Sequence, residues 1–251
     1  MIVAENIVKS FGEGPERRNV LDGVSVEIAA GEFVAIMGPS GSGKSTLLFA
    51  LSGMDAVDGG RVVFDGVDLS RLGDDELADL RRRRMGFVFQ QPTLLRNLSV
   101  LDNIILPSMR DGRKRARQIR ERAKALMATT GIAELEARDV TQASGGQLQR
   151  VGICRALMSD PAVIYGDEPT GALNSTASFE IMALLADIHR RGTTIVLVTH
   201  DPKVATRSER VLFIFDGRIA GEHRAGTYDA SRDDLRAREG ALSTWLAEMG
   251  I

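Results

Sequence analysis

A glycine-rich segment, residues 38–45, constrains this chain more than any other feature. The segment reads GPSGSGKS and fits the pattern G-x-x-x-x-G-K-[ST]. A short apolar run at 32–37 precedes it, and helix-forming residues follow at 46–51. Glycines let consecutive backbone N–H groups approach one anion closely, and the helix that follows directs its positive N-terminus at the same point. The segment therefore predicts a strand, a loop and a helix that together bind phosphate groups.

Two side chains of this segment suit a metal-bound triphosphate. We expect Lys44 to reach the β- and γ-phosphates and the hydroxyl of Ser45 to bind Mg²⁺. The alternative is a glycine-rich turn with a surface lysine, and the strand and helix patterns on either side weigh against it.

A pair of carboxylates follows a second apolar run. Residues 163–165 are apolar, and Asp167 and Glu168 come next, ahead of Pro169. Open α/β sheets bind their ligands at the carboxyl ends of the strands. We expect Asp167 to support Mg²⁺ through water and Glu168 to polarise the attacking water. The alternative is a pair of solvated acids in a turn, and the phosphate loop on the same chain weighs against it.

The composition excludes several other classes of protein. With 43% hydrophobic and 26% charged residues among 251, the chain has globular composition. Its apolar runs are far shorter than the ~20 residues of a membrane-spanning helix, and we expect neither a span nor a secretory signal. The net charge of −2 gives no reason to expect a nucleic-acid partner. The single cysteine, Cys154, is typical of a reducing compartment such as the cytoplasm.

Strand patterns at both ends of the chain enclose a helical middle. The periodicity predicts strands at 24–28, 32–37, 61–64, 87–89, 162–165 and 194–198, and helices at 74–84, 111–130 and 177–190. Strand–helix–strand spacing predicts a parallel sheet, with the helical middle inserted between two halves of one α/β core. Leu242, Trp245, Leu246 and Met249 recur at helical spacing. They predict a short amphipathic helix that packs on its own core or on a partner.

The segment ASGGQLQR at 143–150 narrows the class of protein further. Ser144 and two glycines ahead of an apolar-periodic stretch predict a second anion-binding helix start, and the alternative is a flexible loop with a helix cap. The segment resembles the Leu-Ser-Gly-Gly-Gln signature of the ATP-binding cassette (ABC) ATPases. The resemblance extends to about Glu222, with the motifs in family order. The guanine-reading Asn-Lys-x-Asp of GTPases is absent from the sequence.

The resemblance implies a fold and an assembly. The expected fold is α/β: a P-loop NTPase RecA-like core with an N-terminal antiparallel β-subdomain and an inserted α-helical subdomain. The expected ABC ATPase domain is 1–222, with the β-subdomain and core at 1–90 and 159–222, the helical subdomain at about 91–158 and a C-terminal helical extension at 223–251. In the family the signature serves the ATP of a second subunit. A homodimer would then hold two Mg-ATP head to tail.

Three more residues match positions of the family. Gln90 matches the Q-loop glutamine that contacts Mg²⁺ or water, and its alternative is a turn glutamine. His200 matches the switch histidine that bonds the γ-phosphate, and its alternative is a structural histidine. Phe11 matches the aromatic that stacks on adenine, and its alternative is a core phenylalanine.

The resemblance thus implies three sets of site residues. The catalytic set is Glu168, His200 and Lys44, and the metal set is Ser45, Gln90 and Asp167. The ATP-binding set is Phe11, Gly38, Ser40, Gly41, Ser42, Gly43, Lys44, Ser45, Thr46, Gln90, Ser144, Gly145, Gly146 and Gln147. Ala143 departs from the signature's Leu, and Asn174 stands where the family commonly has Asp and loses a charge.

Two segments indicate a branch of the family. Residues 69–90 and 166–175 look like the macrolide-exporter and lipoprotein-release branch, and the second is similar to ATPases paired with FtsX-type permeases that handle antimicrobial peptides. The resemblance implies a peripheral subunit on the cytoplasmic face of a bacterial membrane, acting on a separate permease. Residues 91–101 are expected to form part of a groove for a short helix of that permease, or else an ordinary surface loop.

Two other functions stay open, and the cargo is undetermined. One is a regulatory ABC ATPase of the cell-division type, which signals through a permease without transport. The other is a soluble, non-transport ABC ATPase, whose usual long coiled-coil insertion or second cassette is absent from this sequence.

Overall fold

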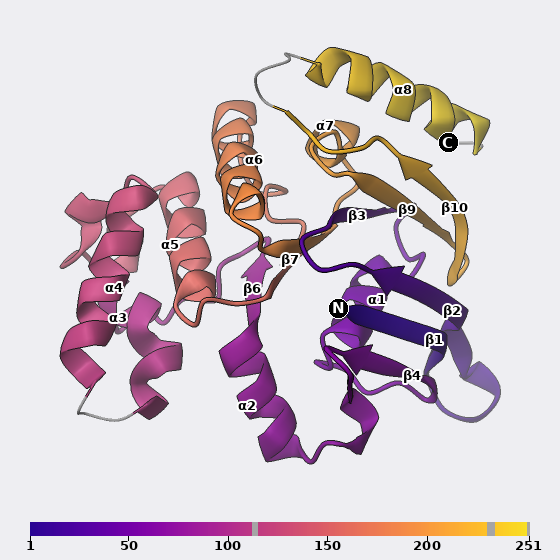
Figure 1. Cartoon of the computed structure of the whole chain (residues 1–251), viewed down its shortest axis with the longest axis horizontal. Coiled ribbons are helices and arrows are strands. Elements are labelled where there is room, and N and C mark those ends of the chain that lie inside the picture. The colour runs from indigo at the N-terminus through magenta and orange to yellow at the C-terminus, as the bar shows by residue number, and fades with distance from the viewer. Residues whose placement is uncertain (112–114, 230–233, 250–251) are drawn as a thin grey trace. The chain divides into compact units, whose positions relative to one another are not determined.

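The computed structural model describes residues 1–111, 115–229 and 234–249 (Figure 1). The chain divides into two compact units, which we call unit 1 (Met1–Ala78 and Thr194–Ile251) and unit 2 (Asp79–Thr193). The domain boundaries expected from the sequence stay a prediction. Each unit is described by itself.

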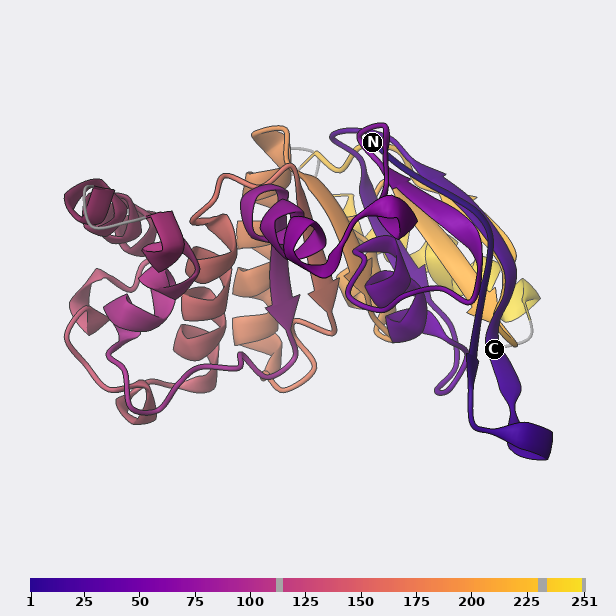
Figure 2. The same cartoon turned by 90° about the horizontal axis from the view of Figure 1, so that it is seen from below.

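Unit 1 contains an antiparallel sheet with the strand order β2-β1-β4-β5 (Figure 1). Its strands are β1 (Ile2–Phe11), β2 (Arg18–Ile28), β4 (Gly59–Phe64) and β5 (Val67–Asp68). Ile2 pairs with both Ile28 and Phe64, and all three side chains are buried. The strand predicted at 24–28 is confirmed and begins earlier, at Arg18, because β1 pairs along its length. The tip of the β1–β2 hairpin carries a short 3-10 helix, η1 (Gly14–Glu16), drawn in indigo at the lower right of Figure 2.

Unit 1 also contains four strands that lie in the order β10-β9-β3-β8. They are β3 (Phe33–Met37), β8 (Thr194–Val198), β9 (Arg210–Phe215) and β10 (Arg218–Arg224). β3 is parallel to both β8 and β9, while β9 and β10 form an antiparallel hairpin. Every residue of β3 and β8 is buried, as expected of parallel strands covered on both faces. The parallel sheet predicted from the strand–helix spacing is confirmed for this part of the chain.

The helices of unit 1 are short except for the last one. They are α1 (Lys44–Leu51), η2 (Leu69–Arg71), α7 (Pro202–Ala205) and α8 (Leu235–Glu248), and α2 (Asp74–Arg84) runs from unit 1 into unit 2. The predicted helix at 74–84 is confirmed at both ends. None of the described helices is long and apolar enough to span a membrane.

The C-terminal helix α8 packs on the core of its own unit. Leu242 and Leu246 are buried in one cluster with Phe213, and the ring of Trp245 meets that of Phe213 edge to face at 6.3 Å. A Cβ added at Gly221 of β10 would lie 2.9 Å from Met249, so the small residue lets the helix approach the strand. Figure 1 shows α8 running alongside this hairpin. The predicted amphipathic helix is confirmed and is longer than its apolar spacing indicated.

Unit 2 combines two parallel strands with a group of helices. The strands are β6 (Met85–Phe89) and β7 (Val163–Asp167). The helices are α3 (Val100–Ile105), η3 (Leu106–Asp111), α4 (Ala116–Thr129), η5 (Ala133–Leu135), η6 (Val140–Gln142), α5 (Gly145–Leu157) and α6 (Ser175–Arg190). The predicted helix at 111–130 is confirmed from Ala116 onward, and residues 112–114 lie outside the described residues.

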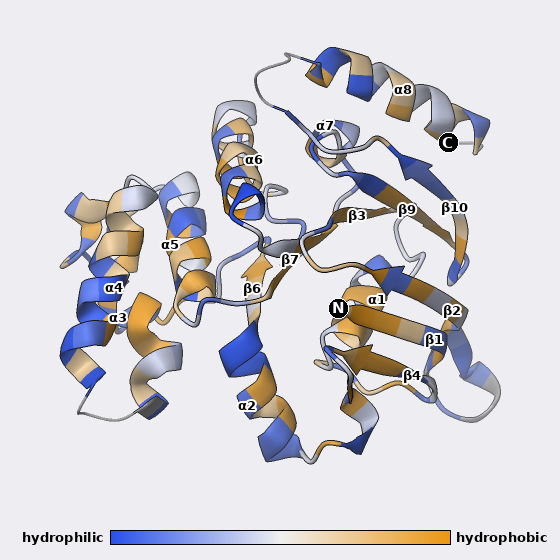
Figure 3. Ribbon diagram, viewed as in Figure 1, coloured by the Kyte–Doolittle hydropathy of each residue, from blue (hydrophilic) through white to orange (hydrophobic). Residues whose placement is uncertain are grey.

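A separate apolar cluster holds α3, α4 and α5 together. Most residues of α3 are hydrophobic, whereas α4 mixes hydrophobic and hydrophilic residues (Figure 3) and buries Ile119, Ala123 and Met127. Ile104, Met127 and Val151 meet in this cluster, and Ala143, the first residue of the predicted signature, packs against it. The cluster therefore orients the start of α5, where the signature residues lie.

The reactivity of the Cys154 thiol reports how well this cluster excludes water. Its thiol is buried beside the hydroxyl of Thr130, with 3.1 Å between Sγ and Oγ1, and burial raises the pKa of Cys154 to about 11. Only about one thiol in a thousand is then ionised at pH 8. We expect a disulfide reagent such as DTNB to modify native protein very slowly at pH 8 and denatured protein within seconds. Equally fast modification of the native protein would contradict this packing.

Candidate functional site

The predicted phosphate loop runs from the end of β3 to the start of α1. Gly43 is the N-cap of α1, with a φ of 101°, and Lys44 begins the helix. A Cβ at Gly43 would lie 2.6 Å from the carbonyl oxygen of Val20. At Gly38, where φ is 151°, a Cβ would lie 2.1 Å from the carbonyl oxygen of Ile214. The loop therefore passes so close to the backbones of β2 and β9 that neither glycine has room for a side chain.

The side chains of the loop are arranged to receive an anion. Lys44 is 8% exposed, and its ammonium donates to the carbonyl oxygens of Gly38 (3.0 Å) and Pro39 (2.7 Å). The hydroxyl of Ser42 is buried and has no hydrogen-bond partner in the described part of the chain. A buried hydroxyl without a partner is costly, and a phosphate oxygen would satisfy it. The loop thus fits the triphosphate that its sequence predicts.

His200 lies at the same edge of the sheet as the phosphate loop. β3 and β8 are parallel, with Ile36 opposite Val198, so their carboxyl ends coincide. His200 follows β8 in a turn in which the hydroxyl of Thr199 accepts the N–H of Asp201 at 3.0 Å. The side chain of Asp201 in turn caps α7. Because β3 and β8 are neighbouring strands, His200 lies at the sheet edge beside the end of β3, where the predicted phosphate loop begins.

Phe11 lies at the end of β1, within unit 1. Phe11 is 49% exposed, and the ammonium of Lys9 lies over its ring, 5.3 Å from the ring centroid. The core-phenylalanine alternative is therefore wrong, because the residue is not buried. Its stacking on adenine stays a prediction.

In unit 2, three predicted residues lie at one edge of the β6–β7 pair. Phe89 pairs with Asp167, so Gln90 and Glu168 follow neighbouring strand ends. A Cβ built on Gly171 would lie 2.9 Å from the amide nitrogen of Gln90 and 3.2 Å from a carboxylate oxygen of Glu168. The structure thus brings together two side chains that are far apart in the sequence. Their common neighbour, Gly171, was not among the predicted site residues, and its only signal is a small residue soon after the two acids.

Glu168 has an unusual backbone conformation. Among the described residues, five non-glycine residues have a positive φ, and the other four are Asn or Asp, which tolerate it. Glu168, with a φ of 46°, is the exception. Such a conformation costs about 1–3 kcal/mol and is concentrated at functional sites. The strain therefore agrees with a reactive role for this carboxylate.

The signature residues form the start of α5 in unit 2. Ser144 is the N-cap, and its hydroxyl accepts the N–H of Gln147 at 3.3 Å. The side chain of Gln147 accepts the N–H of Ser144 at 2.9 Å, which completes a capping box. Gly145 and Gly146 form the first turn, and a Cβ at Gly146 would lie 3.3 Å from Ala177 of α6. The cap predicted as the alternative is therefore present, on a helix start whose dipole also suits an anion.

Asn174, the departure from the family pattern, caps α6. Its side-chain oxygen accepts the N–H of Ala177 at 2.9 Å. An uncharged amide thus performs the capping that an aspartate performs equally well.

The predicted site residues are divided between the two units. Unit 1 contains Phe11, Gly38, Ser40, Gly41, Ser42, Gly43, Lys44, Ser45, Thr46 and His200. Unit 2 contains Gln90, Ser144, Gly145, Gly146, Gln147, Asp167 and Glu168. Their roles toward one nucleotide stay predictions.

A strand, glycine loop and helix with a buried lysine define a P-loop nucleotide-binding domain. Residues 21–171 match the family described as ABC transporter. The chain is 43% identical over 224 residues to the macrolide export ATP-binding/permease protein MacB of Chlorobaculum tepidum, covering 89% of this chain and 34% of that protein. It is also 43% identical to MacB of Marinobacter nauticus, covering 98% and 38%. The chain therefore spans about a third of the length of these relatives.

Solved structures agree with the sequence comparison. The ATP-binding cassette MJ0796, solved as a dimer in a post-hydrolysis state with ADP and Pi, matches with a TM-score of 0.84 and 38% identity, covering 91% of this chain and 100% of that chain. The cassette MJ1267 in its ADP conformation matches with a TM-score of 0.79 and 28% identity, covering 97% and 94%. The chain belongs to the ABC transporter family. The predicted ABC ATPase fold, the ATPase class and the resemblance to the macrolide-exporter branch are confirmed.

The contact at Gly38 predicts the effect of one methyl group. In Gly38→Ala the new Cβ meets the Ile214 carbonyl, so the loop has to move. We expect Mg-ATP affinity to fall at least tenfold in calorimetric titration. The control is Gly192→Ala, which shares a positive φ (98°) but has open space around the Cβ. It should lose a little stability and no affinity, and equal affinities of Gly38→Ala and the wild type would contradict the assigned geometry.

Proposed function

We propose that this chain binds Mg-ATP and hydrolyses it to ADP and phosphate in order to move a membrane permease of an export system. The observation that carries the proposal is the phosphate loop, in which two glycines have no room for a side chain and a buried hydroxyl lacks a partner. The match to the ABC transporter family supports ATP as the nucleotide of this loop, and the MacB relatives support a role in export. Those relatives are named for both ATP binding and permease activity, which supports a permease partner.

The residues of the site take the following roles in this proposal. The backbone of Ser40, Gly41, Gly43 and Thr46, the hydroxyl of Ser42 and the ammonium of Lys44 bind the phosphates. Ser45, Gln90 and Asp167 offer hydroxyl, amide and carboxylate oxygens, the donor types that suit Mg²⁺. Mg²⁺ would neutralise charge on the phosphates. Glu168 orients and polarises the attacking water, and His200 donates a hydrogen bond to the γ-phosphate.

The signature points to a second ATPase subunit. In the proposed homodimer, Ser144, Gly145, Gly146 and Gln147 of one copy bind the ATP held by the phosphate loop of the other copy. The dimeric MJ0796 structures support this arrangement, because the whole length of that cassette matches 91% of this chain. A two-fold interface completes both sites at once. ATP binding would close the dimer, and hydrolysis would release it.

A cavity in unit 2 supports the permease contact. It has a volume of about 480 Å³, and its lining includes Gln91, Pro92, Leu94, Arg96 and Leu148. Its mixture of apolar and polar walls suits one short amphipathic helix. We propose that a cytoplasmic helix of an FtsX-type permease binds there, which would hold the chain at the cytoplasmic face of the membrane. Peptide, drug or lipoprotein cargo fits this branch.

Glu168→Gln tests the assigned chemistry. The substitution keeps the shape of the side chain and removes the carboxylate that polarises water, so we expect ATP turnover to fall at least a hundredfold while Mg-ATP still binds. With its ATP uncleaved, the variant should form a stable dimer, measured by light scattering with and without Mg-ATP.

Lys44→Ala serves as the matched comparison for this test. It should lose ATP binding and the dimer together, because Lys44 acts in the phosphate loop. A Glu168→Gln variant that binds ATP and stays monomeric would contradict the composite site, and unreduced turnover would contradict the role of Glu168.

Site-specific photocrosslinking tests the permease contact. A photoreactive residue at Arg96 lies on the wall of the cavity, whereas one at the exposed Val67 lies on β5, which does not line it. In gently solubilised native membranes, we expect crosslinks from position 96 to cytoplasmic peptides of a permease with a large extracytoplasmic domain. Crosslinks from both positions alike, or recovery of the chain without any membrane protein, would contradict the proposed docking and favour a soluble ABC ATPase.

A further inference from the structure

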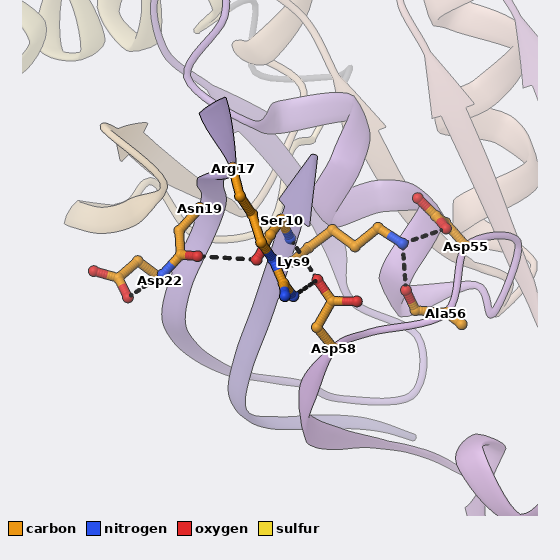
Figure 4. A network of polar contacts seen from close by, with 8 residues as sticks. All are labelled: Lys9, Ser10, Arg17, Asn19, Asp22, Asp55, Ala56 and Asp58. Carbon is orange, nitrogen blue, oxygen red and sulfur yellow. Dashed lines mark hydrogen bonds and ion pairs between the residues drawn. The ribbon is translucent and has the colours of Figure 1, made fainter. Parts of the chain in front are cut away.

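The segment that follows α1 holds the end of β1 by a group of polar contacts (Figure 4). The ammonium of Lys9 donates to the carboxylate of Asp55 and to the carbonyl oxygen of Ala56, both at 2.7 Å. The side chain of Lys9 is only 12% exposed, so this cation has exchanged most of its hydration for two acceptors in one segment. Its position is therefore set by the segment and not by solvent.

Asp58 of the same segment holds the strand backbone. Its carboxylate accepts the N–H of Ser10 at 2.7 Å, and its own N–H donates to the carbonyl of Val8 at 2.8 Å. Arg17, across the hairpin, pairs with the same carboxylate at 3.5 Å. The N–H of Ser10 lowers the pKa of Asp58, which keeps the carboxylate charged. The strand is thus bonded on three successive residues, Val8 to Ser10, immediately before Phe11.

These contacts place a cation on one face of an aromatic ring. Lys9 and Phe11 are two residues apart on β1, and the ammonium lies 5.3 Å from the centroid of the Phe11 ring. Phe11 is still 49% exposed, which leaves it accessible to a second partner. A cation attracts π-electron density toward its own side, which favours stacking of an electron-rich heteroaromatic ring on the other side.

We propose that Lys9 is a positioning residue for base recognition: it holds Phe11 so that the accessible face of the ring stacks on the purine base of the nucleotide. The inference rests on the proposed function, in which Phe11 receives adenine. It adds a route from the base to the phosphates, because Asp55, Ala56 and Asp58 follow directly from the helix that begins at Lys44. The helix α1 and the segment that follows it then connect the phosphate loop to the base platform.

A merely structural role for Lys9 predicts something different. If the Lys9–Asp55 pair only stabilised the hairpin, its loss would lower the melting temperature and weaken every ligand of unit 1 alike. A positioning role weakens only ligands that carry a base. Inorganic tripolyphosphate, which has the phosphates of ATP and no base, separates these two cases.

The test is calorimetric titration of the full chain with Mg-ATP and with Mg-tripolyphosphate. For Lys9→Met we expect the Kd for Mg-ATP to rise about fivefold, with the Kd for tripolyphosphate unchanged. Lys9→Arg, which restores a cation, should recover most of the affinity. The matched control is Arg61→Met, which removes an exposed cation that pairs with Glu5 of the same β1 strand, and it should leave both ligands unaffected.

The outcomes separate this inference from the proposed function. Unchanged ATP affinity in Lys9→Met, or equal losses for both ligands, would overturn the role of Lys9. Unchanged ATP affinity in Phe11→Ala would instead overturn the assignment of Phe11 to the base. Should Lys9→Met fail to fold, Asp55→Ala, which removes one of the two acceptors of Lys9, replaces it with the same expected pattern.

Discussion

The close approach of backbone to backbone around the phosphate loop is the constraint on which the rest of this structure depends. The carbonyl oxygens of Val20 and Ile214 occupy the space where side chains of Gly43 and Gly38 would lie. Val20 belongs to β2 and Ile214 to β9, so both sheets of unit 1 meet at the loop. Backbone contacts of this kind leave no freedom for adjustment, because neither partner has a side chain that can rotate away. The loop is therefore shaped before any nucleotide arrives, which lowers the cost of binding.

A second constraint acts on the carboxylate side, within unit 2. Glu168 adopts a conformation that most residues avoid, and Gly171 leaves just enough room for Gln90 and Glu168 beside it. Strain at one residue persists only when its surroundings determine its position. Here the β6–β7 pairing fixes Phe89 opposite Asp167, and the two side chains that follow are directed to one point. In the proposed function, a carboxylate held in this way would orient the attacking water with little loss of entropy during reaction.

Local patterns in the sequence predicted the parts of the site that depend on neighbouring residues. The glycine loop, the acids after β7 and the serine cap of α5 all follow from chemistry within a few residues. The strands β1, β9 and β10 were not predicted. Contacts outside each strand stabilise them: β1 pairs with β2 and with the distant β4, and β9 pairs with the distant β3 and forms a hairpin with β10. The amphipathic stripe of α8 indicated a shorter helix than the structure shows.

Buried charge was the second feature that sequence patterns missed. Arg238 of α8 is 8% exposed, although arginine is usually a surface residue. Its guanidinium donates to the carbonyls of Thr206, Ser208, Ala225 and Gly226. Those acceptors are backbone carbonyls between 12 and 32 residues away from Arg238 in the sequence. No local pattern identifies them. Lys9 is a similar case, since its acceptors lie 46 and 47 residues away.

The central claim is that residues 38–45 cradle a nucleoside triphosphate. The most direct measurement is a crystal structure of the chain with Mg²⁺ and a non-hydrolysable ATP analogue. We expect the γ-phosphate within hydrogen-bond distance of the Lys44 ammonium, the hydroxyl of Ser42 bonded to a phosphate oxygen, and the base stacked on Phe11. A nucleotide bound elsewhere, or none at the loop at saturating concentration, would contradict it.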